Sequence, residues 1–398
     1  MSEWQHARGF IELALSLEKY VPGYFDFYYG PEEVRTAVES KGKLPLGALS
    51  DQADGMLEST RADQTLTAAR RIYLCAELGA MQTTLRILQG EKMSYVEETR
   101  GLYGLTPRWT DERVFEEAHR TLEELYTGSG SLAERRAQFL EKTVIPPDKI
   151  EAVIQECAED FRSRTRAIID LPEEETCDFT LVQDQPWSAY NWYLGGYTSR
   201  IDLNIDLPVY AGLIPHLIAH ESYPGHHTEF TVKEQDLFRE KGWLEHSILL
   251  TNTPSCVPSE GIAENALEMI TTPIEHEDCL QRILDRAGLK EVNGTQILHV
   301  MNARRALGKL GINRALMLHV EGATDQEVID YGVRYGLLSE EQSRKGIEFL
   351  KDPLWRAYIP LYALGYELVK AYLGEGEEKV ERFRKLIREP ITTTQLEA

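Results

Sequence analysis

The sequence predicts a mainly α-helical protein in which two helical lobes flank a cleft, with a small β-sheet beside the helix that lines it. Apolar residues recur at helical spacing over most of the first 170 residues and again from about residue 206 to residue 388. Clear alternation of apolar and polar residues is confined to the segment between residues 178 and 206. The hydrophobic content of 42% in a chain of 398 residues allows sizeable cores and excludes disordered and fibrous classes.

The N-terminal part is predicted to be helical. Helical stripes, separated by turn residues, cover three of its segments: residues 7–20, 62–89 and 111–126. Pro146-Pro147 is a helix start signal, and a further stripe follows it at residues 150–168. We therefore expect an N-terminal helical lobe at residues 1–145 and a second, catalytic domain at residues 146–398.

A strand is predicted from Thr198 to Ile205, where apolar and polar residues alternate. Gly195-Gly196 precedes this segment and Pro208 follows it, so the strand is short. A short strand with mixed faces is typical of an exposed sheet edge. We expect it to lie at the edge of the small sheet, next to the helix that comes after it.

The charge balance limits the partners. The chain has 43 Lys and Arg against 65 Asp and Glu, a net charge of −22, and such a field repels nucleic acids and anionic membrane surfaces. The first residues have no signal-peptide features, and no apolar stretch is long enough to span a membrane. Five scattered cysteines without a Cys-x-x-Cys pair are expected to be reduced thiols. We expect a cytoplasmic protein.

Four histidines lie within one window of twelve residues, His216 to His227. In zinc hydrolases, neutral imidazoles bind the ion and an adjacent carboxylate takes a proton from the metal-activated water. His220-Glu221 followed closely by His226 fits this pattern, so Zn²⁺ is the expected cofactor and Glu221 the expected general base. The alternative is a histidine-rich helix end whose ring nitrogens are all hydrogen-bonded.

The spacing of these histidines requires a break in the helix. In an unbroken helix His220 and His227 would lie roughly 10 Å apart along the axis, too far to share one ion. Pro224 cannot donate a backbone hydrogen bond, and Gly225 permits backbone angles that other residues avoid, so we predict a bulge there. A two-residue bulge brings His226 to the position of a normal i+4 ligand. His226 is therefore the predicted second ligand, and His227 a supporting residue or an alternative ligand.

A third zinc ligand is expected from a carboxylate on a following helix. Pro258-Ser259 looks like a helix start, so Glu260 and Glu264 share one face of that helix at i and i+4. They repel each other unless a cation lies nearby, and a metal would supply one. We predict Glu260 as a ligand and Glu264 as a supporting residue or an alternative ligand; two solvated acids are the other interpretation. His216, four residues before His220, is expected to pack or to support the site.

At these two motifs the chain resembles the bacterial family known as domain of unknown function 885. The family hallmark is His-Glu-x-x-Pro-Gly-His-His followed by Glu-Gly-Trp-Ala. The first motif is complete from His220 to His227, and the second is present as Glu260-Gly261-Ile262-Ala263, with isoleucine in place of tryptophan. The likeness also covers Pro186 to Asn204 and Arg314 to Tyr331, so it spans roughly the C-terminal half.

The family in turn is similar to helical zinc peptidases such as angiotensin-converting enzyme, thimet oligopeptidase and the thermostable carboxypeptidases. Their motif is His-Glu-x-Gly-His, and removal of two residues from the present sequence gives that spacing with His226, not His227, as the second ligand. The resemblance also implies that Glu260 corresponds to their ligand glutamate and Glu264 to the acid that supports it. The family pattern itself has no acid at position 264.

Three tyrosines, Tyr358, Tyr362 and Tyr366, recur at i, i+4 and i+8 on a predicted helix that is kinked at Pro360. Buried aromatic packing is one interpretation. The other, implied by the resemblance, is a phenol that donates a hydrogen bond to the developing oxyanion. Tyr366 maps directly onto the family pattern, so Tyr366 and Tyr362 are the candidate catalytic tyrosines.

These features predict a zinc-dependent hydrolase, specifically a metallopeptidase that cleaves short peptides in a cleft between helices. Glu221 would take a proton from water and deliver it to the leaving amine. Hydrolysis of a non-peptide amide by the same groups is a second interpretation. A third is a non-catalytic helical protein that binds metal or peptide on the same scaffold. Glu221 argues against the third, because a purely structural metal site has no need of it.

Overall fold

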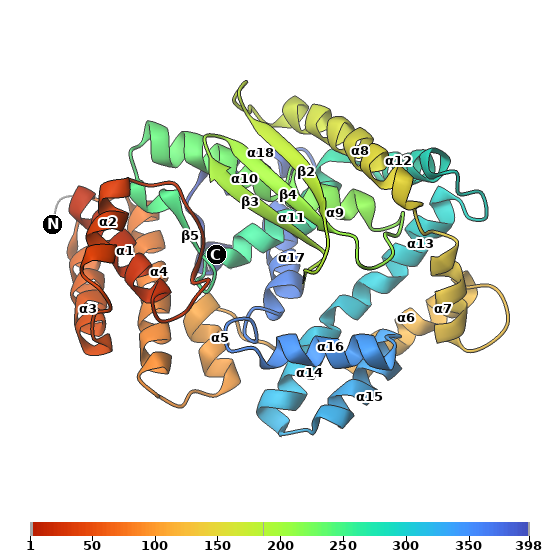
Figure 1. The fold of residues 1–398 in the computed structure, drawn as a ribbon, viewed down its shortest axis with the longest axis horizontal. Coiled ribbons are helices and arrows are strands. Elements are labelled where there is room, and N and C mark those ends of the chain that lie inside the picture. Colours follow the sequence, from red (N-terminus) through yellow and green to blue (C-terminus); the bar gives the residue numbers. More distant parts are fainter. Residues whose placement is uncertain (1–2, 186, 397–398) are drawn as a thin grey trace.

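The computed structural model describes residues 3–185 and 187–396, so Pro186 lies outside the described residues. Helices dominate these residues, and the strands form one two-stranded and one three-stranded sheet, which confirms the prediction of a mainly α fold. Figure 1 shows the helices of residues 3–88 at one end of an elongated molecule and α6 (Glu112–Leu125) with α7 (Leu132–Glu141) at the other. The three-stranded sheet and the helices that carry the histidines lie between these ends.

Three of the N-terminal helices, at residues 3–18, 68–88 and 112–125, match the predicted stripes, and the other four were not predicted individually. Besides α6 and α7, the N-terminal helices are α1 (Glu3–Glu18), α2 (Glu32–Ser40), α3 (Leu46–Ala62), α4 (Ala68–Leu88) and α5 (Tyr95–Tyr103). The apolar faces of α1 to α4 form a core in which Phe10 and Leu78 are fully buried. Ile248 and Leu250, from a strand far along the chain, complete that core. The burial of these long-range partners fixes the first helices to the later part of the protein.

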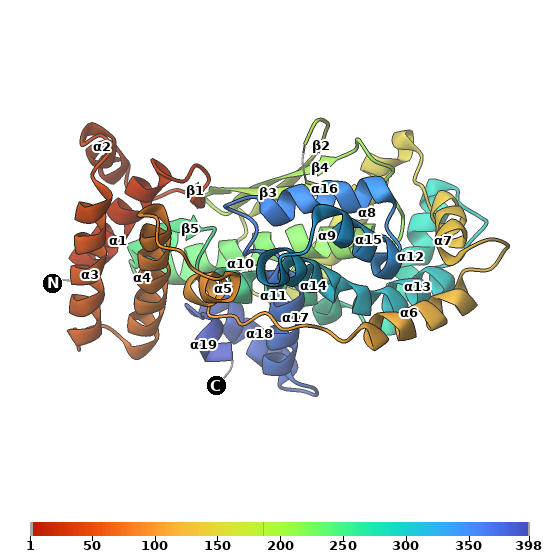
Figure 2. The same ribbon diagram turned by 90° about the horizontal axis from the view of Figure 1, so that it is seen from below.

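In Figure 2 the three-stranded sheet lies along one side of the molecule, and most of the later helices lie below it. The later helices are α8 (Pro147–Ile168), α9 (Ile214–Glu221), α10 (His226–Lys233), α11 (Cys256–Ile270), α12 (Pro273–Ala287), α13 (Gly294–Arg304), α14 (Leu310–Leu316), α15 (Asp325–Gly336), α16 (Glu340–Lys351), α17 (Pro360–Leu373), α18 (Lys379–Arg388) and α19 (Thr393–Leu396), with short 3₁₀ or π turns at Glu234–Glu240, Leu244–Ser247, Arg305–Lys309 and Met317–Glu321. No helix among the described residues is both long enough and apolar enough to cross a membrane.

The three-stranded sheet has the order β2 (Thr176–Val182), β4 (Thr198–Asn204), β3 (Ala189–Gly195). β4 pairs in parallel with β2 and antiparallel with β3, so the prediction of an edge strand at residues 198–205 is wrong. The polar residues of β4 face partners instead of solvent: the Ser199 hydroxyl bonds to His227, and Asp202 accepts a hydrogen bond from Trp192. Alternation alone cannot distinguish a solvated polar face from one that is hydrogen-bonded.

The two-stranded sheet was not predicted. β1 (Phe25–Tyr28) pairs antiparallel with β5 (Ile248–Leu250), and both strands are too short to produce a recognisable period in the sequence. This pairing ties an N-terminal segment to the chain just before α11. The register is irregular, because Phe25 pairs with Leu250 and Phe27 with Leu249, which leaves Asp26 as an extra residue in a β-bulge.

The hydrophobic clusters cross the predicted domain boundary at residue 145. Phe115 packs in a cluster with Val300 and Tyr335, and Leu102 packs in another with Val257. The N-terminal helices thus share their cores with later elements. A division of the chain into residues 1–145 and 146–398 stays a prediction.

Helix α11 packs very closely on α17. A Cβ atom added at Gly261 would lie 2.4 Å from the carbonyl oxygen of Gly365, and one added at Gly365 would lie 2.8 Å from the carbonyl oxygen of Val257. Larger residues would force the two helices apart. Gly261 follows Glu260 directly, so this contact fixes the position of the predicted ligand helix.

Candidate metal site

The helix is interrupted between α9 and α10, where the sequence predicts a bulge. α9 ends at Glu221 and α10 begins at His226, and the Tyr223–Pro224 peptide between them is cis. The Gly225 amide donates to the Ala219 carbonyl at 2.9 Å, and a Cβ atom at Gly225 would lie only 1.9 Å from the His220 carbonyl oxygen. Only glycine fits here, because any side chain would push α10 away from α9.

The break brings three predicted ligands together. His220 Nε2 lies 3.7 Å from Glu260 Oε2, and His226 Nε2 lies 3.7 Å from Glu260 Oε1. The ligand atoms of these three residues are all within 4.8 Å of one another. Two donors that share a tetrahedral zinc ion lie about 3.3 Å apart, so each of the two histidine–carboxylate separations would have to shorten by about 0.4 Å.

The electrostatics of this cluster suit a cation. His220 Nδ1 and Glu260 Oε2 are buried without a hydrogen-bond partner. Burial, together with the nearby charges of Glu264 and Glu221, raises the pKa of Glu260 to about 8. Burial also lowers the pKa of His226 to about 4, so its imidazole is neutral at pH 7, as a metal ligand must be. A divalent ion would balance the excess of carboxylates, and the donor set of two imidazoles and a carboxylate fits zinc.

Glu264 lies behind His220, a position that the sequence did not predict. Its Oε1 atom is 3.6 Å from His220 Nδ1, and its Oε2 atom is 3.6 Å from His216 Nε2. A carboxylate behind the second ring nitrogen of a ligand histidine orients the ring and raises its basicity. His216 therefore adjoins the site through Glu264 instead of packing in a core.

Two further supports were missed by the sequence analysis. Behind His226, the Nδ1 atom lies 3.4 Å from the Ser259 hydroxyl, which in turn donates to Glu229 Oε2 at 2.6 Å. Tyr358 donates to Glu260 Oε1 at 2.7 Å. Ser259 precedes Glu260 and could have been suspected from that position, but the sequence offers no spacing that links Tyr358 with Glu260.

Glu221 follows His220 at the end of α9 and is almost completely buried, with 8% of its surface exposed. Burial raises its pKa to about 8, and the charges of Asp26 and Glu264 add to that effect. The Asn191 side chain donates to the Glu221 carbonyl oxygen at 2.7 Å, which fixes the end of the helix to β3. We call the group of His220, His226 and Glu260 the metal-type cluster. A carboxylate with a raised pKa beside this cluster is suited to accept and release a proton near neutral pH.

The candidate catalytic tyrosines occupy different surroundings. Although 41% of Tyr362 is exposed, nearby protein atoms desolvate its hydroxyl, and its pKa is raised further by Glu260 and Glu221. The Tyr362 hydroxyl therefore lies within electrostatic range of Glu260 and Glu221. The Tyr366 hydroxyl instead belongs to an ionic group, where it accepts from Lys370 at 2.6 Å and contacts Arg305.

His227 points away from the cluster. It is fully buried, with Nδ1 at 2.8 Å from the Ser199 hydroxyl and Nε2 at 3.1 Å from Glu175 Oε2. Glu175 also accepts from Arg162 Nε at 2.7 Å and from the Tyr223 hydroxyl at 2.7 Å. Both ring nitrogens of His227 thus have protein partners. Glu175 lies 52 residues earlier, and no sequence pattern links it with His227.

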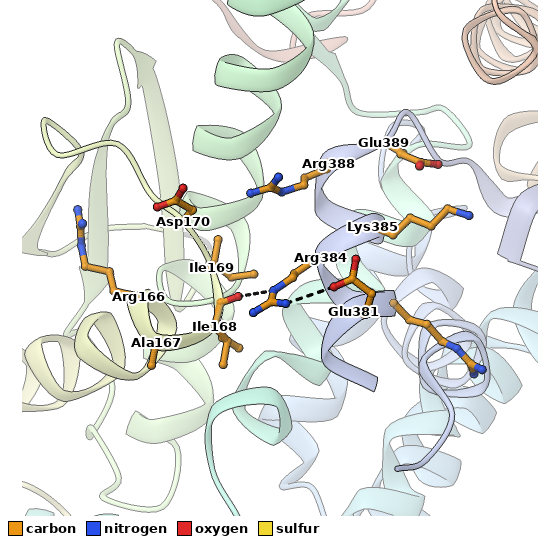
Figure 3. Close-up of a pocket in the computed structure, with 11 residues that line it drawn as sticks. Arg166, Ala167, Ile168, Ile169, Asp170, Glu381, Arg384, Lys385, Arg388 and Glu389 are labelled. Carbon is orange, nitrogen blue, oxygen red and sulfur yellow. Dashed lines mark hydrogen bonds and ion pairs between the residues drawn. The ribbon is translucent and has the colours of Figure 1, made fainter. Parts of the chain in front are cut away.

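A separate pocket of about 730 Å³ lies between the end of α8 and α18 (Figure 3). Four arginines and Lys385 line much of it, and the arginines are engaged with neighbouring groups: for example, Arg384 Nε donates to the Ile168 carbonyl oxygen at 2.7 Å, and Arg388 lies 3.7 Å from Asp236. The residues of the metal-type cluster do not line this pocket.

No family model matches the chain, and no curated protein matches its sequence. Its fold is similar to that of a protein from Colwellia psychrerythraea described as a "putative lipoprotein", with a TM-score of 0.52 at 13% identity over 92% of this chain and 71% of that one. Comparison with a protein of unknown function from Shewanella oneidensis gives a TM-score of 0.47 at 13% identity and covers 94% of this chain and 81% of that one. Comparison with Trypanosoma cruzi metallocarboxypeptidase 1 gives a TM-score of 0.41 at 12% identity and covers 99% of this chain and 93% of that one. The first likeness shows a shared fold alone, and family membership stays a prediction.

Proposed function

We propose that this protein is a zinc-dependent metallopeptidase that cleaves short peptides. The observation that carries the proposal is the convergence of His220, His226 and Glu260, with their Nε2–carboxylate separations of 3.7 Å and a buried, unpartnered Glu260 Oε2 atom. These three residues would hold the ion. When bound, zinc supplies a Lewis acid that lowers the pKa of a water molecule and polarises the scissile carbonyl.

The protein's own residues would do the proton chemistry. Glu221 would take a proton from the attacking water and pass it to the leaving amine. Its pKa, about 8 without a cation, would fall when a divalent ion binds nearby, so that the carboxylate becomes a base at neutral pH. Tyr362, whose pKa the same carboxylates raise, would donate a hydrogen bond to the developing oxyanion. For Tyr366 this role would require release from Lys370 and Arg305.

The direct test combines metal analysis of the purified protein with digestion of a peptide library. We expect about one zinc per chain, and cleavage that a chelator abolishes and added zinc restores. Bound zinc without cleavage of any peptide would favour a non-catalytic binding protein. Absence of a transition metal, together with no calorimetric uptake of zinc, would exclude the proposal altogether. A cytoplasmic location stays a prediction.

A further inference from the structure

Asp26 comes from the N-terminal segment but lies beside the candidate site. It is the extra residue of the bulge in β1, and bulges re-aim side chains next to functional sites. Tyr190 on β3 donates a hydrogen bond to Asp26 Oδ1. Tyr190 also interacts electrostatically with Glu221 and with Tyr362, and the charge of Asp26 acts on Glu221, so Asp26 lies within electrostatic range of the candidate general base.

The charge of Asp26 has no counter-ion in the protein. Among residues 3–185 and 187–396, its one hydrogen-bond partner is the neutral phenol of Tyr190, and no lysine, arginine or histidine pairs with it. Burial accordingly raises the pKa of Asp26 to about 6. Glu175 provides the contrast, because two arginines neutralise it. Asp26 is partly buried, and a partly buried carboxylate without a counter-ion is a suitable acceptor for a positive charge that a ligand brings.

The geometry favours a point charge over other cations. Tyr190 occupies one oxygen of Asp26, so a guanidinium could not form its usual two parallel bonds. A divalent metal needs several charged or polar ligands, and Asp26 with a phenol offers too few. A primary ammonium has three donors, and the free Asp26 oxygen and the Tyr190 oxygen are suitable acceptors.

We propose that Asp26 and Tyr190 form a subsite for a primary ammonium group of the substrate, so that peptides with this charge close to the scissile bond are preferred. This inference rests on the proposed peptidase function, and it adds a substrate class to it. The ammonium is either the free N-terminus of a peptide or the side chain of a lysine. The β1–β5 pairing would hold the subsite at a fixed position, since β5 leads directly into α11, the helix of Glu260.

The test compares three peptides: Ala-Ala-Ala, N-acetyl-Ala-Ala-Ala and N-acetyl-Lys-Ala-Ala. Cleavage is measured as kcat/KM with the zinc-loaded wild type, with Asp26→Asn and with Asp178→Asn, a control that removes an exposed acid on β2. We expect Asp26→Asn to reduce kcat/KM about 10- to 100-fold for a peptide with an ammonium group. For N-acetyl-Ala-Ala-Ala, which has no ammonium group, we expect a reduction of less than about twofold. Asp178→Asn should change neither. Whichever ammonium peptide responds identifies the source of the charge.

Binding provides a second readout. The same peptides are titrated calorimetrically into Glu221→Gln protein with and without Asp26→Asn, and melting temperatures check the folding of each variant. If wild type treats all three peptides alike, or Asp26→Asn weakens all of them equally, the subsite is wrong while the peptidase stands. If nothing is cleaved but ammonium peptides bind in an Asp26-dependent manner, the peptidase is wrong and the subsite stands. If no peptide is cleaved and none binds, both the peptidase function and the subsite are wrong.

Discussion

Two buried histidine–glutamate clusters lie on either side of the same turn, and they differ in how fully their polar atoms are paired. In one, His227 bonds to Ser199 and Glu175, and Glu175 is neutralised by arginines. In the other, His220 and Glu260 each keep a buried atom without a partner. Neighbouring residues in the sequence, His226 and His227, thus belong to opposite kinds of environment.

This difference separates a structural network from a candidate reactive site. A fully hydrogen-bonded network orders the fold and resists titration. A cluster with unpartnered atoms and raised carboxylate pKa values costs stability, and such clusters are typical of metal and catalytic sites. The comparison predicts that substitutions in the His227 network will affect stability, whereas substitutions in the His220 cluster will affect metal binding and turnover.

The largest expected effect is on turnover. Glu221→Gln keeps the size of the side chain but cannot accept a proton near neutral pH, so we expect kcat to fall by about 10²- to 10⁴-fold with zinc content and melting temperature unchanged. Steady-state kinetics on a cleaved peptide, with metal analysis of the same sample, measures both. Wild-type turnover by this variant under metal-replete conditions would exclude Glu221 as the general base.

The next effect concerns stability and its pH dependence. Burial raises the pKa of Glu175, but hydrogen bonds from His227, Tyr223 and two arginines outweigh it and hold the pKa at about 2, against 4.5 ordinarily. The resulting stabilisation, about 3 kcal/mol, is complete above about pH 5 and is lost as the pH falls from 4.5 towards 2.

Urea unfolding of wild type and Glu175→Gln at pH 7 and pH 3 tests this linkage. We expect wild type to be more stable by about 3 kcal/mol at pH 7, with roughly two thirds of that difference gone at pH 3. Glu174→Gln, which alters the exposed neighbouring acid, serves as the matched control and should show no such change. A difference that is independent of pH would show that Glu175 acts through packing and not through its charge.

A smaller effect is expected from the support of Glu260. Tyr358→Phe removes the hydrogen bond to Glu260 Oε1 but keeps the aromatic packing, so we expect zinc affinity to fall about 10-fold without loss of stability. Competition with a fluorescent chelator measures the affinity, and Tyr362→Phe is the comparison, since Tyr362 makes no hydrogen bond to Glu260 among the contacts of the described residues. Equal zinc affinities for wild type and Tyr358→Phe would contradict the supporting role.

Local sequence signals predicted much of the helical fold. They also identified His220, His226 and Glu260, which the structure brings together at the candidate site. Pro224 and Gly225 dictate where α9 ends, and the break alone is enough to predict that His226 turns towards His220. The edge position of β4 could not be predicted, because its polar residues look solvated until their distant partners are known. Glu175, Asp26 and Tyr358 were missed for the same reason: each acts through a contact with a segment far away in the sequence.

The most direct test of the central claim is the zinc content of two adjacent variants, His226→Ala and His227→Ala, purified under identical conditions. The account predicts that His226→Ala loses the metal but keeps nearly wild-type stability when compared with metal-free wild type. His227→Ala should keep about one zinc per chain and lose stability, because Glu175 and Ser199 lose a buried partner. Retention of zinc by His226→Ala and its loss from a folded His227→Ala would contradict the account.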